Sequence, residues 1–394
     1  MNAAELCYLD HAATTPMRAS AVTAMMPFLS DLYANPSGSH RFARQARAAV
    51  DDARDVVAAA VGCRPGEVVF TGGGTESDNT ALLGCLDVAK SRTRLVCPAT
   101  EHHAVLHVVE QAGGAVVPTD ATARVRLDVL AEALGPDVAA VSVMAVNNEV
   151  GTVNDVGAVA ALVRDRAPGA VVHTDAIQAP CWLDLRPLWA HVDLLSLSAH
   201  KFGGPKGVGA LIVRHGTDLS PLIVGGGQER ELRSGTHNVA GIAAMASALA
   251  GTDAERSDTC QHIGALRDRL VDGVMAGLDG VLETVNRADK VAGSAHLCFA
   301  DVESESLLYL LDQAGLCASA ASACASGAME PSHVLAAMGI TREWSVGAVR
   351  MSLGRTTTLA ETDRAVDALV DAVGTLRERR ARRRAGASIG AVPS

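Results

Sequence analysis

Short runs of apolar, often β-branched residues alternate with longer stretches of helical periodicity over the first two-thirds of the chain. The runs predict strands, and stretches such as Arg44–Val61 and Val156–Arg166 predict helices. The expected strands are Glu67–Phe70, Arg94–Cys97, Ala139–Val146, Ala170–His173, Asp193–Ser198 and Gly209–Val213. This alternation is typical of an α/β fold, in which helices flank both faces of a mainly parallel sheet. Ligands of such folds bind beyond the carboxyl ends of the strands.

The pattern changes after about Thr252, where a long helical stretch begins. A strand-like run at Ala295–Phe299 and a closing helix from about Thr362 follow it, and we interpret this part as a smaller α+β domain. The predicted organisation is a large domain over residues 15–255, a small domain formed by residues 1–14 and 256–376, and a basic, flexible tail over residues 377–394.

The composition is that of a folded, acidic protein. The chain has 394 residues, of which 48% are apolar and 20% charged, so it can bury a sizeable core. With 34 Lys and Arg against 44 Asp and Glu, the formal charge of −10 disfavours a general nucleic-acid binder. The start lacks the pattern of a signal peptide, and no stretch has the ~18 uninterrupted apolar residues of a membrane helix. We therefore expect a cytoplasmic protein with no membrane contact.

One basic cluster near the C-terminus departs from this acidic balance. It consists of Arg377, Arg379, Arg380, Arg382, Arg383 and Arg384. The simpler interpretation is the solvated end of the last helix, and a contact with nucleic acid or a partner is the alternative.

The cysteines give a second constraint. There are nine, an odd number, and none forms a C-x-x-C pair, which argues against a disulfide framework or a zinc site. We expect most of them to be buried thiols in a reducing compartment. Cys317 and Cys324 fall in residues 314–328, where fourteen of fifteen residues are Ala, Ser, Gly or Cys. Such a run of small residues predicts a flexible loop.

Polar clusters follow several expected strands. After Phe70, the glycine turn Thr71–Ser77 leads into a helix, whose free N–H groups and dipole make a good phosphate seat. Thr75 would add a hydroxyl group to this seat. The turn lacks the P-loop lysine and the G-x-G-x-x-G spacing, so a plain turn is the alternative interpretation.

Histidines and acids follow other strands. In Thr100–His103, adjacent histidines point to different sides of a helix or strand and chelate a metal poorly, so we predict no metal site. One of them could instead stack on an aromatic cofactor and move protons near neutral pH, or be a capped surface histidine. Asp175, with Gln178 one turn further on, could cap a helix or hold the ring nitrogen of a pyridine cofactor protonated.

The last strand of this set leads into a lysine. Lys201 lies in a turn rich in glycine and small residues, where a solubilising charge explains it poorly and an amine placed to form a Schiff base explains it better. Lys206, between Pro205 and Gly207, is the second candidate. A phosphate seat, a stacking histidine, an acid for a ring nitrogen and a Schiff-base lysine together indicate a pyridoxal 5′-phosphate site.

These motifs resemble the pyridoxal-phosphate-dependent cysteine desulfurases of the iron–sulfur-assembly type, within the class V, fold type I aminotransferase-like enzymes. The resemblance covers nearly the whole chain and implies a large cofactor-binding domain and a small α+β domain. The motifs that carry it are Tyr8–Pro16, Asn35–Ser37, Gly74–Ser77, Thr100–His102, Asn147–Glu149, Ser198–Lys201, Gly225–Glu229, Arg233–Thr236 and Ser352–Arg355.

The resemblance implies a role for each matching residue. Lys201 forms the Schiff base, Asp175 pairs with the pyridinium nitrogen, Gln178 bonds the ring hydroxyl and His102 stacks on the ring. The residues expected to bind the phosphate are Gly74, Thr75, Ser198 and His200, with Thr236 contributed by the other subunit of a homodimer. Asn148 and Arg350 hold the substrate carboxylate, a task that suits the planar guanidinium group.

The nucleophile implied by the resemblance is Cys324, and the motif that ends Glu330-Pro331-Ser332 is similar to that of the longer-looped group of desulfurases. Cys317 is the competitor, but its place after Leu316 predicts the end of a buried strand. The chain departs from the family pattern at Ala321, where glycine is frequent, and in its basic tail, which does not resemble a scaffold-docking segment.

The activity implied is conversion of L-cysteine to L-alanine, with the sulfur passing to Cys324 as a persulfide and then to an acceptor protein that the sequence does not identify. Iron–sulfur cluster assembly, tRNA thiolation and DNA phosphorothioation all consume such sulfur. The alternatives are another enzyme of the same fold, such as a selenocysteine lyase or an aminotransferase, and a catalytically silent sulfur carrier.

Overall fold

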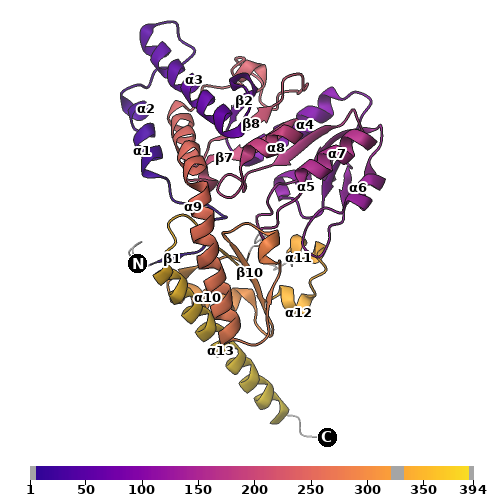
Figure 1. Ribbon diagram of the computed structural model, residues 1–394, viewed down its shortest axis with the longest axis vertical. Coiled ribbons are helices and arrows are strands. Elements are labelled where there is room, and N and C mark those ends of the chain that lie inside the picture. Colours follow the sequence, from indigo (N-terminus) through magenta and orange to yellow (C-terminus); the bar gives the residue numbers. More distant parts are fainter. Residues whose placement is uncertain (1–5, 321–331, 390–394) are drawn as a thin grey trace.

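The computed structural model describes residues 6–320 and 332–389 and contains one large sheet and two small ones (Figure 1). In the large sheet the strand order is β2-β8-β7-β6-β5-β3-β4. Its strands are β2 (Val68–Thr71), β3 (Arg94–Pro98), β4 (Ala115–Val117), β5 (Val138–Ser142), β6 (Val171–Asp175), β7 (Leu194–Ser198) and β8 (Gly209–Val213). Only β8 runs antiparallel to its neighbours, so the expected α/β fold with a mainly parallel sheet is confirmed.

The two faces of the large sheet follow the period-two alternation of its strands. In β8, Ala210 and Ile212 pack on one face, whereas Leu211 packs on the other. The helices α4 (Gly74–Val88) and α5 (His103–Gln111) cover the second face. The first is covered by α3 (Arg41–Val61), α6 (Leu127–Ala133), α7 (Val156–Arg166), α8 (Leu185–His191) and part of α9 (Val239–Gly277).

The strand bounds differ from the prediction in two places. β5 ends at Ser142, not at the expected Val146, although residues 143–146 are buried and apolar. They leave the regular ladder but keep two hydrogen bonds to β6, from the N–H of Val143 and of Ala145. β4 was not expected, because it is only three residues long and Val116 in it is exposed. A run of apolar residues indicates burial, but it does not indicate which backbone groups form the hydrogen bonds of a strand.

A single helix connects the two parts of the molecule. α9 begins at Val239, well before the change of pattern at Thr252, and its first half packs on α1 (Ala19–Met25) and α3. Its second half packs on α13 (Leu359–Ile389) and contributes to the core beneath the small sheet. The expected domain boundary at residue 255 therefore falls inside a continuous helix (Figure 1).

The second part of the chain surrounds a small antiparallel sheet of β9 (Val281–Glu283), β10 (Ser294–Phe299) and β12 (Ala348–Ser352). The N-terminal strand β1 (Cys7–Tyr8) pairs in parallel with β11 (Leu316–Cys317), which ties the start of the chain to this part. The remaining helices are α2 (Pro27–Ser30), α10 (Ser304–Gln313), α11 (His333–Ala337) and α12 (Arg342–Ser345).

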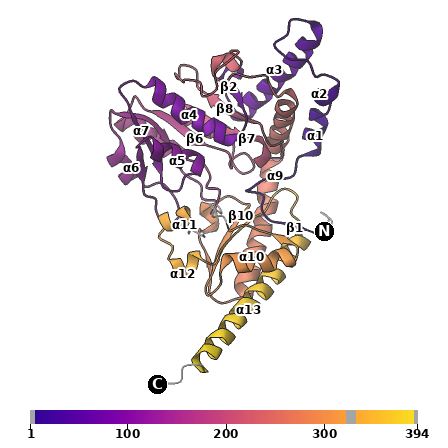
Figure 2. The ribbon, with the colours of Figure 1, turned by 180° about the vertical axis from the view of Figure 1, so that it is seen from behind.

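The closing helix α13 continues through the segment expected to be a flexible tail. Its C-terminal end projects beyond the rest of the fold (Figure 2). Arg377 donates hydrogen bonds to the carbonyl oxygens of Ala300, Asp279 and Gly280, and Arg380 forms an ion pair with Asp301. These contacts hold the helix to the small sheet beyond residue 376. Within the described ranges, no helix combines the length and the apolar character needed to cross a membrane.

Three chain segments meet at one edge of the large sheet, around Gly209. Gly209 pairs with Thr71 at the end of β2 and with Ser198 at the end of β7. A Cβ at Gly209 would lie 2.5 Å from the carbonyl oxygen of Leu197 and 2.9 Å from the backbone of Gly73. The absence of a side chain here lets the turn after β2 approach the turn after β7.

We predict that Gly209→Ala lowers the free energy of unfolding by about 1–3 kcal/mol, because the added methyl group overpacks three backbone segments. Denaturant unfolding would measure the change. Gly66→Ala is the matched control, since a Cβ at Gly66 has no atom within 4 Å, and it should stay within about 0.5 kcal/mol of the parent. Equal stabilities of the two variants would contradict the predicted close approach.

Candidate active site

A cavity of about 300 Å³ lies at the carboxyl ends of β6 and β7, beside the start of α4. This is a size typical of a small-ligand site. Its lining is Ala12, Ala13, Gly74, Thr75, His102, Met144, Asn148, Asp175, Ile177, Gln178, Ser198, His200, Lys201 and Arg350. The structure thus brings together every sequence-predicted site residue except Thr236 and Cys324. Cys324 lies outside the described residues, and Lys206, the second lysine candidate, does not line the cavity.

One end of the cavity is built to receive an anion. α4 begins there at Gly74, next to Thr75, and its first N–H groups have no partner within the helix. A Cβ at Gly74 would lie 2.2 Å from Cδ1 of Ile177, so a larger residue would not fit. Ser198 and His200 approach from the end of β7. Burial, with the charges of Lys201 and Lys206, lowers the pKa of His200 to about 4, so its ring is neutral at physiological pH.

His102 presents an aromatic ring to the cavity. It caps α5, and its Nδ1 accepts the N–H of Ala104 at 3.1 Å, which places the proton of the neutral ring on Nε2. Burial lowers the pKa of His102 to about 4, with a further contribution from the charge of Lys201. The ring is nevertheless exposed on its cavity side. A neutral, flat surface of this kind suits stacking against an aromatic ligand.

Asp175, the last residue of β6, is an acidic group in the lining of the cavity. Its Oδ1 accepts the N–H of Ile177 at 2.8 Å. Burial raises the pKa of Asp175 to about 6, against the opposing effects of the Ile177 bond and of Lys201. Asp78 and Glu101 are fully buried nearby, and burial together with the charge of Asp175 raises the pKa of both. This cluster of carboxyl groups favours a positively charged nitrogen beside Asp175.

Lys201 is fixed by backbone oxygens. Its Nζ donates hydrogen bonds to the carbonyls of Ala12 at 2.6 Å and Ala13 at 2.9 Å. Burial and the charge of Arg350 together lower the pKa of Lys201 to about 8, whereas the charges of Asp175 and Asp10 oppose the shift. The amine is therefore partly neutral near physiological pH, which is the form that acts as a nucleophile or a base.

Arg350 on β12 forms a buried cationic corner of the cavity. Its Nη1 donates to the carbonyl of Asn148 at 3.0 Å, and its Nη2 forms an ion pair with Asp10 at 2.7 Å. Its Nε is buried without a hydrogen-bond partner. An unpaired guanidinium N–H beside Asn148 indicates a position for a ligand carboxylate.

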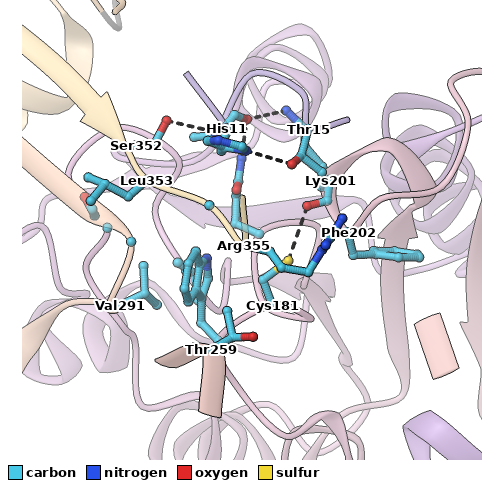
Figure 3. Close-up of a pocket in the computed structure, with 18 of the residues that line it drawn as sticks. His11, Thr15, Cys181, Lys201, Phe202, Thr259, Val291, Ser352, Leu353 and Arg355 are labelled. Atoms are coloured by element: carbon cyan, nitrogen blue, oxygen red, sulfur yellow. Dashed lines mark hydrogen bonds between the residues drawn. The ribbon is translucent and has the colours of Figure 1, made fainter. Parts of the chain in front are cut away.

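A second cavity of about 60 Å³ adjoins the first and shares Lys201 and Arg350 with it (Figure 3). The Cys181 thiol donates to the carbonyl oxygen of Lys201 at 3.4 Å, and His11 is bonded to Thr15 at 2.7 Å. The carbonyl of His200 also accepts the N–H of Thr15, at 3.1 Å. The backbone around Lys201 is thus held by the segment after β6 and by the N-terminal segment.

Thr236 does not line the cavity and is exposed on the loop between β8 and α9. Within this loop lie three successive left-handed residues, Glu229, Arg230 and Glu231, with φ of 48°, 57° and 66°. Glu229 is buried there and accepts hydrogen bonds from Arg54, His237 and the N–H of Phe70. Although burial raises its pKa, the bonds from His237 and Arg54 lower the pKa of Glu229 to about 2. This ionised carboxylate stabilises a strained turn that presents Thr236 to solvent.

Several groups of the site were not singled out from the sequence. Asp10 was named only within a motif and Asp78 was not named, yet both shape the charges around Lys201 and Asp175. His107 lies one turn after His103, and their rings stack at 4.7 Å. The sequence feature that could have identified Asp10 and Asp78 is an acidic residue inside an apolar or glycine-rich segment, where a solvated charge is uncommon.

We predict that Lys201 in the cofactor-free protein reacts with acetic anhydride with a pH midpoint near 8, because burial disfavours the charged amine. Arg350→Gln should move the midpoint upward by removing a neighbouring cation, and Asp175→Asn should move it downward. Peptide mass spectrometry over a pH series would measure both shifts. A midpoint near the ordinary value of 10.5 in the parent would contradict the prediction.

The residues present fit pyridoxal 5′-phosphate. The anion seat at α4, the neutral ring of His102, the carboxyl cluster at Asp175 and the amine of Lys201 match its phosphate, ring, ring nitrogen and aldehyde in chemical character. The packing of Ile177 against Gly74 leaves no room for a side chain at the start of α4.

Comparisons with known proteins agree with this geometry. The model of the class V aminotransferase family matches residues 7–365. The chain is 43% identical over 401 residues to an IscS-like cysteine desulfurase of Mycobacterium tuberculosis, covering 98% of this chain and 100% of that protein. A solved NifS-like protein is 34% identical with a TM-score of 0.88, covering 94% of this chain and 100% of that one. A structure described as SspA in complex with cysteine is 30% identical with a TM-score of 0.76, covering 89% and 99%. The chain therefore belongs to the class V aminotransferase family, whose cysteine desulfurases are pyridoxal 5′-phosphate enzymes.

Proposed function

We propose that this protein is a cysteine desulfurase that converts L-cysteine to L-alanine and transfers the sulfur to Cys324 as a persulfide. The observation that carries the proposal is the position of Arg350, a buried cation that lines the same cavity as Lys201 and Asp175. A carboxylate bound at Arg350 and Asn148 would place an amino acid next to the Lys201 amine. The curated relative named a cysteine desulfurase and the solved relative with bound cysteine support this substrate.

The residues that would hold the cofactor divide by its chemical parts. Gly74, Thr75, Ser198 and His200 would bind the phosphate, His102 would stack on the ring, Gln178 would bond the ring hydroxyl, and Asp175 would retain a proton on the ring nitrogen. In the structure, Nε2 of Gln178 donates to the carbonyl of Ala12 at 2.8 Å, so its Oε1 is the atom left for that hydroxyl. When bound, the cofactor supplies an electron sink for a bond broken at the substrate Cα.

Proton transfer falls to Lys201 and His102. With its pKa lowered to about 8, the Lys201 amine is a base of suitable strength to remove the Cα proton. His102 carries its neutral-state proton on Nε2, the nitrogen from which it can donate at the substrate sulfur. The carbonyl oxygens of Ala12 and Ala13 orient Lys201 Nζ for these transfers.

Sulfur transfer would be the work of Cys324. Its thiolate forms a new bond to the substrate sulfur, the substrate C–S bond breaks, and the substrate carbon is protonated to give alanine. Cys317 is the less suitable thiol. It pairs with Tyr8 in the sheet of β1 and β11, and burial, with the charges of Asp312 and Asp10, raises the pKa of Cys317.

We predict that Cys324→Ala lowers sulfide release from L-cysteine by roughly a hundredfold or more, because the nucleophile of the transfer is lost. Cys317→Ala is the matched control and should retain the parental rate. Sulfide assay under a thiol reductant would measure both variants. An aminotransferase or a selenocysteine lyase of this fold would keep its turnover in Cys324→Ala, and parental sulfide release by that variant would reject the proposal. A silent carrier would show no Schiff-base absorbance that Lys201→Ala removes.

A homodimer would complete the site. Thr236 lies outside the cavity of its own chain, on a loop braced by Glu229, so the partner's phosphate site is the proposed destination of its hydroxyl. An earlier part of the same loop contains Leu222, Ile223 and Val224, whose exposed fractions are 44%, 38% and 78%. Consecutive exposed apolar side chains of this kind mark protein interfaces.

We predict a solution mass twice the 40.5 kDa of the chain, measured by light scattering. Thr236→Ala should leave this mass unchanged and weaken retention of the cofactor during dialysis, since one phosphate hydrogen bond is lost while the apolar contact remains. A monomeric parent, or unchanged retention in Thr236→Ala, would contradict the shared site.

The cellular setting proposed is the cytoplasm, with transfer of the persulfide sulfur to an acceptor protein that serves iron–sulfur cluster assembly, tRNA thiolation or DNA phosphorothioation. All eight cysteines in the described part of the chain are free, as expected in a reducing compartment. The resemblance of the sequence to the iron–sulfur-assembly type supports the first of these settings. The basic end of α13 is a candidate contact for that acceptor.

A further inference from the structure

The chain on either side of residues 321–331, which include Cys324, is hydrogen-bonded to the cavity residue Arg350 and to the residue that follows the cavity residue Asn148. Before this segment, Ser319 and Arg350 exchange backbone hydrogen bonds of 3.1 and 2.7 Å. After it, Ser332 is the residue that caps α11. The side-chain partner of Ser332 is Glu149, 183 positions earlier in the sequence.

The direction of the Ser332 hydrogen bond is fixed by its surroundings. Ser332 Oγ accepts the N–H of Leu335 at 3.2 Å and donates to Oε2 of Glu149 at 2.5 Å. The exposed fractions of Ser332 and Glu149 are 6% and 3%, so water does not compete for this bond. Capping of α11 needs only the acceptor function of Ser332. The donated proton is therefore available to bind a second element of the structure.

Glu149 stands beside the residues proposed to hold the substrate. It follows Asn148 directly, and the carbonyl of Asn148 accepts from Arg350. The N–H of Glu149 donates to Oδ1 of Asn147 at 2.9 Å, which fixes the turn that carries Asn148. Burial raises the pKa of Glu149 to about 7, while the Ser332 bond and the charge of Arg350 oppose the shift.

A second bond joins α11 to the cavity close by. Nε2 of His333 lies 2.9 Å from the carbonyl oxygen of Glu101, so this nitrogen carries the proton. Glu101 directly precedes His102. Ser332 and His333 thus connect the return of the chain to the residues preceding or following two site residues, Asn148 and His102.

We propose that Glu149 is a positioning residue for sulfur transfer. By accepting the proton of Ser332, it holds the point at which the chain re-enters the fold after Cys324 in a fixed relation to Asn148 and Arg350. This inference deepens the proposed desulfurase activity and rests on it. Glu149 acts through Ser332 and does not touch the reacting sulfur.

The experiment compares Glu149→Gln, Ser332→Ala and the double variant in the cofactor-loaded enzyme, mixed with L-cysteine without reductant. Two signals are followed: the change in cofactor absorbance on cysteine binding, and the persulfide on Cys324, measured by alkylation and mass spectrometry at timed points. We expect the absorbance change of the parent in all variants. Persulfide formation should slow by about tenfold to a hundredfold, because the chain that follows Cys324 loses its attachment beside Asn148.

The double variant should be no slower than the slower single variant, since both changes remove the same bond. Glu67→Gln is the matched control. Glu67 is also a buried glutamate that accepts hydrogen bonds, from the N–H groups of Arg64 and His215, but, unlike Glu149, it does not adjoin a cavity residue in the sequence. It should form persulfide at the parental rate.

Three results would overturn the inference. They are a parental rate of persulfide formation in either single variant, losses that multiply in the double variant, or an equal loss of the cofactor absorbance change, which would indicate a general structural defect. Failure of the proposed function would look different, because the parent enzyme itself would then form no persulfide from L-cysteine.

Discussion

Two basic side chains, the half-buried Lys201 and the buried Arg350, line one small cavity, and the rest of the site is arranged around the cost of keeping them there. Burial and the charge of Arg350 lower the pKa of Lys201, and oxygen atoms surround both side chains. The N-terminal segment supplies many of these atoms, with the carbonyls of Ala12 and Ala13 at Lys201 and the carboxylate of Asp10 at Arg350. β1 pairs with β11 and so holds that segment at the small sheet, which couples the fold of the second half of the chain to the charges of the first.

The large sheet explains why much of this could be predicted. Strand β8 and helix α7 have the expected bounds, because a short apolar run and an amphipathic helix are both local patterns. The same is true of Lys201 and Asp175, which lie at strand ends where parallel strands converge. For these residues the order of the chain already indicates their common location.

The contacts that escaped prediction are those between distant positions. Asp10 and Arg350 are separated by 340 residues, and Glu149 and Ser332 by 183. No periodicity relates such pairs, because their members lie in segments that only the tertiary fold brings together. The full length of α9 was not predicted from the sequence, for a related reason. Its first half is small and apolar and its second half is charged, so the pattern changed at Thr252 although the backbone did not.

The thiols described here have one property in common, with a practical consequence. All eight have a pKa raised by burial, to about 11 for Cys7 and about 12 for Cys63, Cys85, Cys181 and Cys298. Electrophiles react with thiolates, so these groups contribute little labelling at neutral pH. The eight thiols therefore give little background labelling, so a single reactive cysteine could be labelled and counted without mutating the other eight.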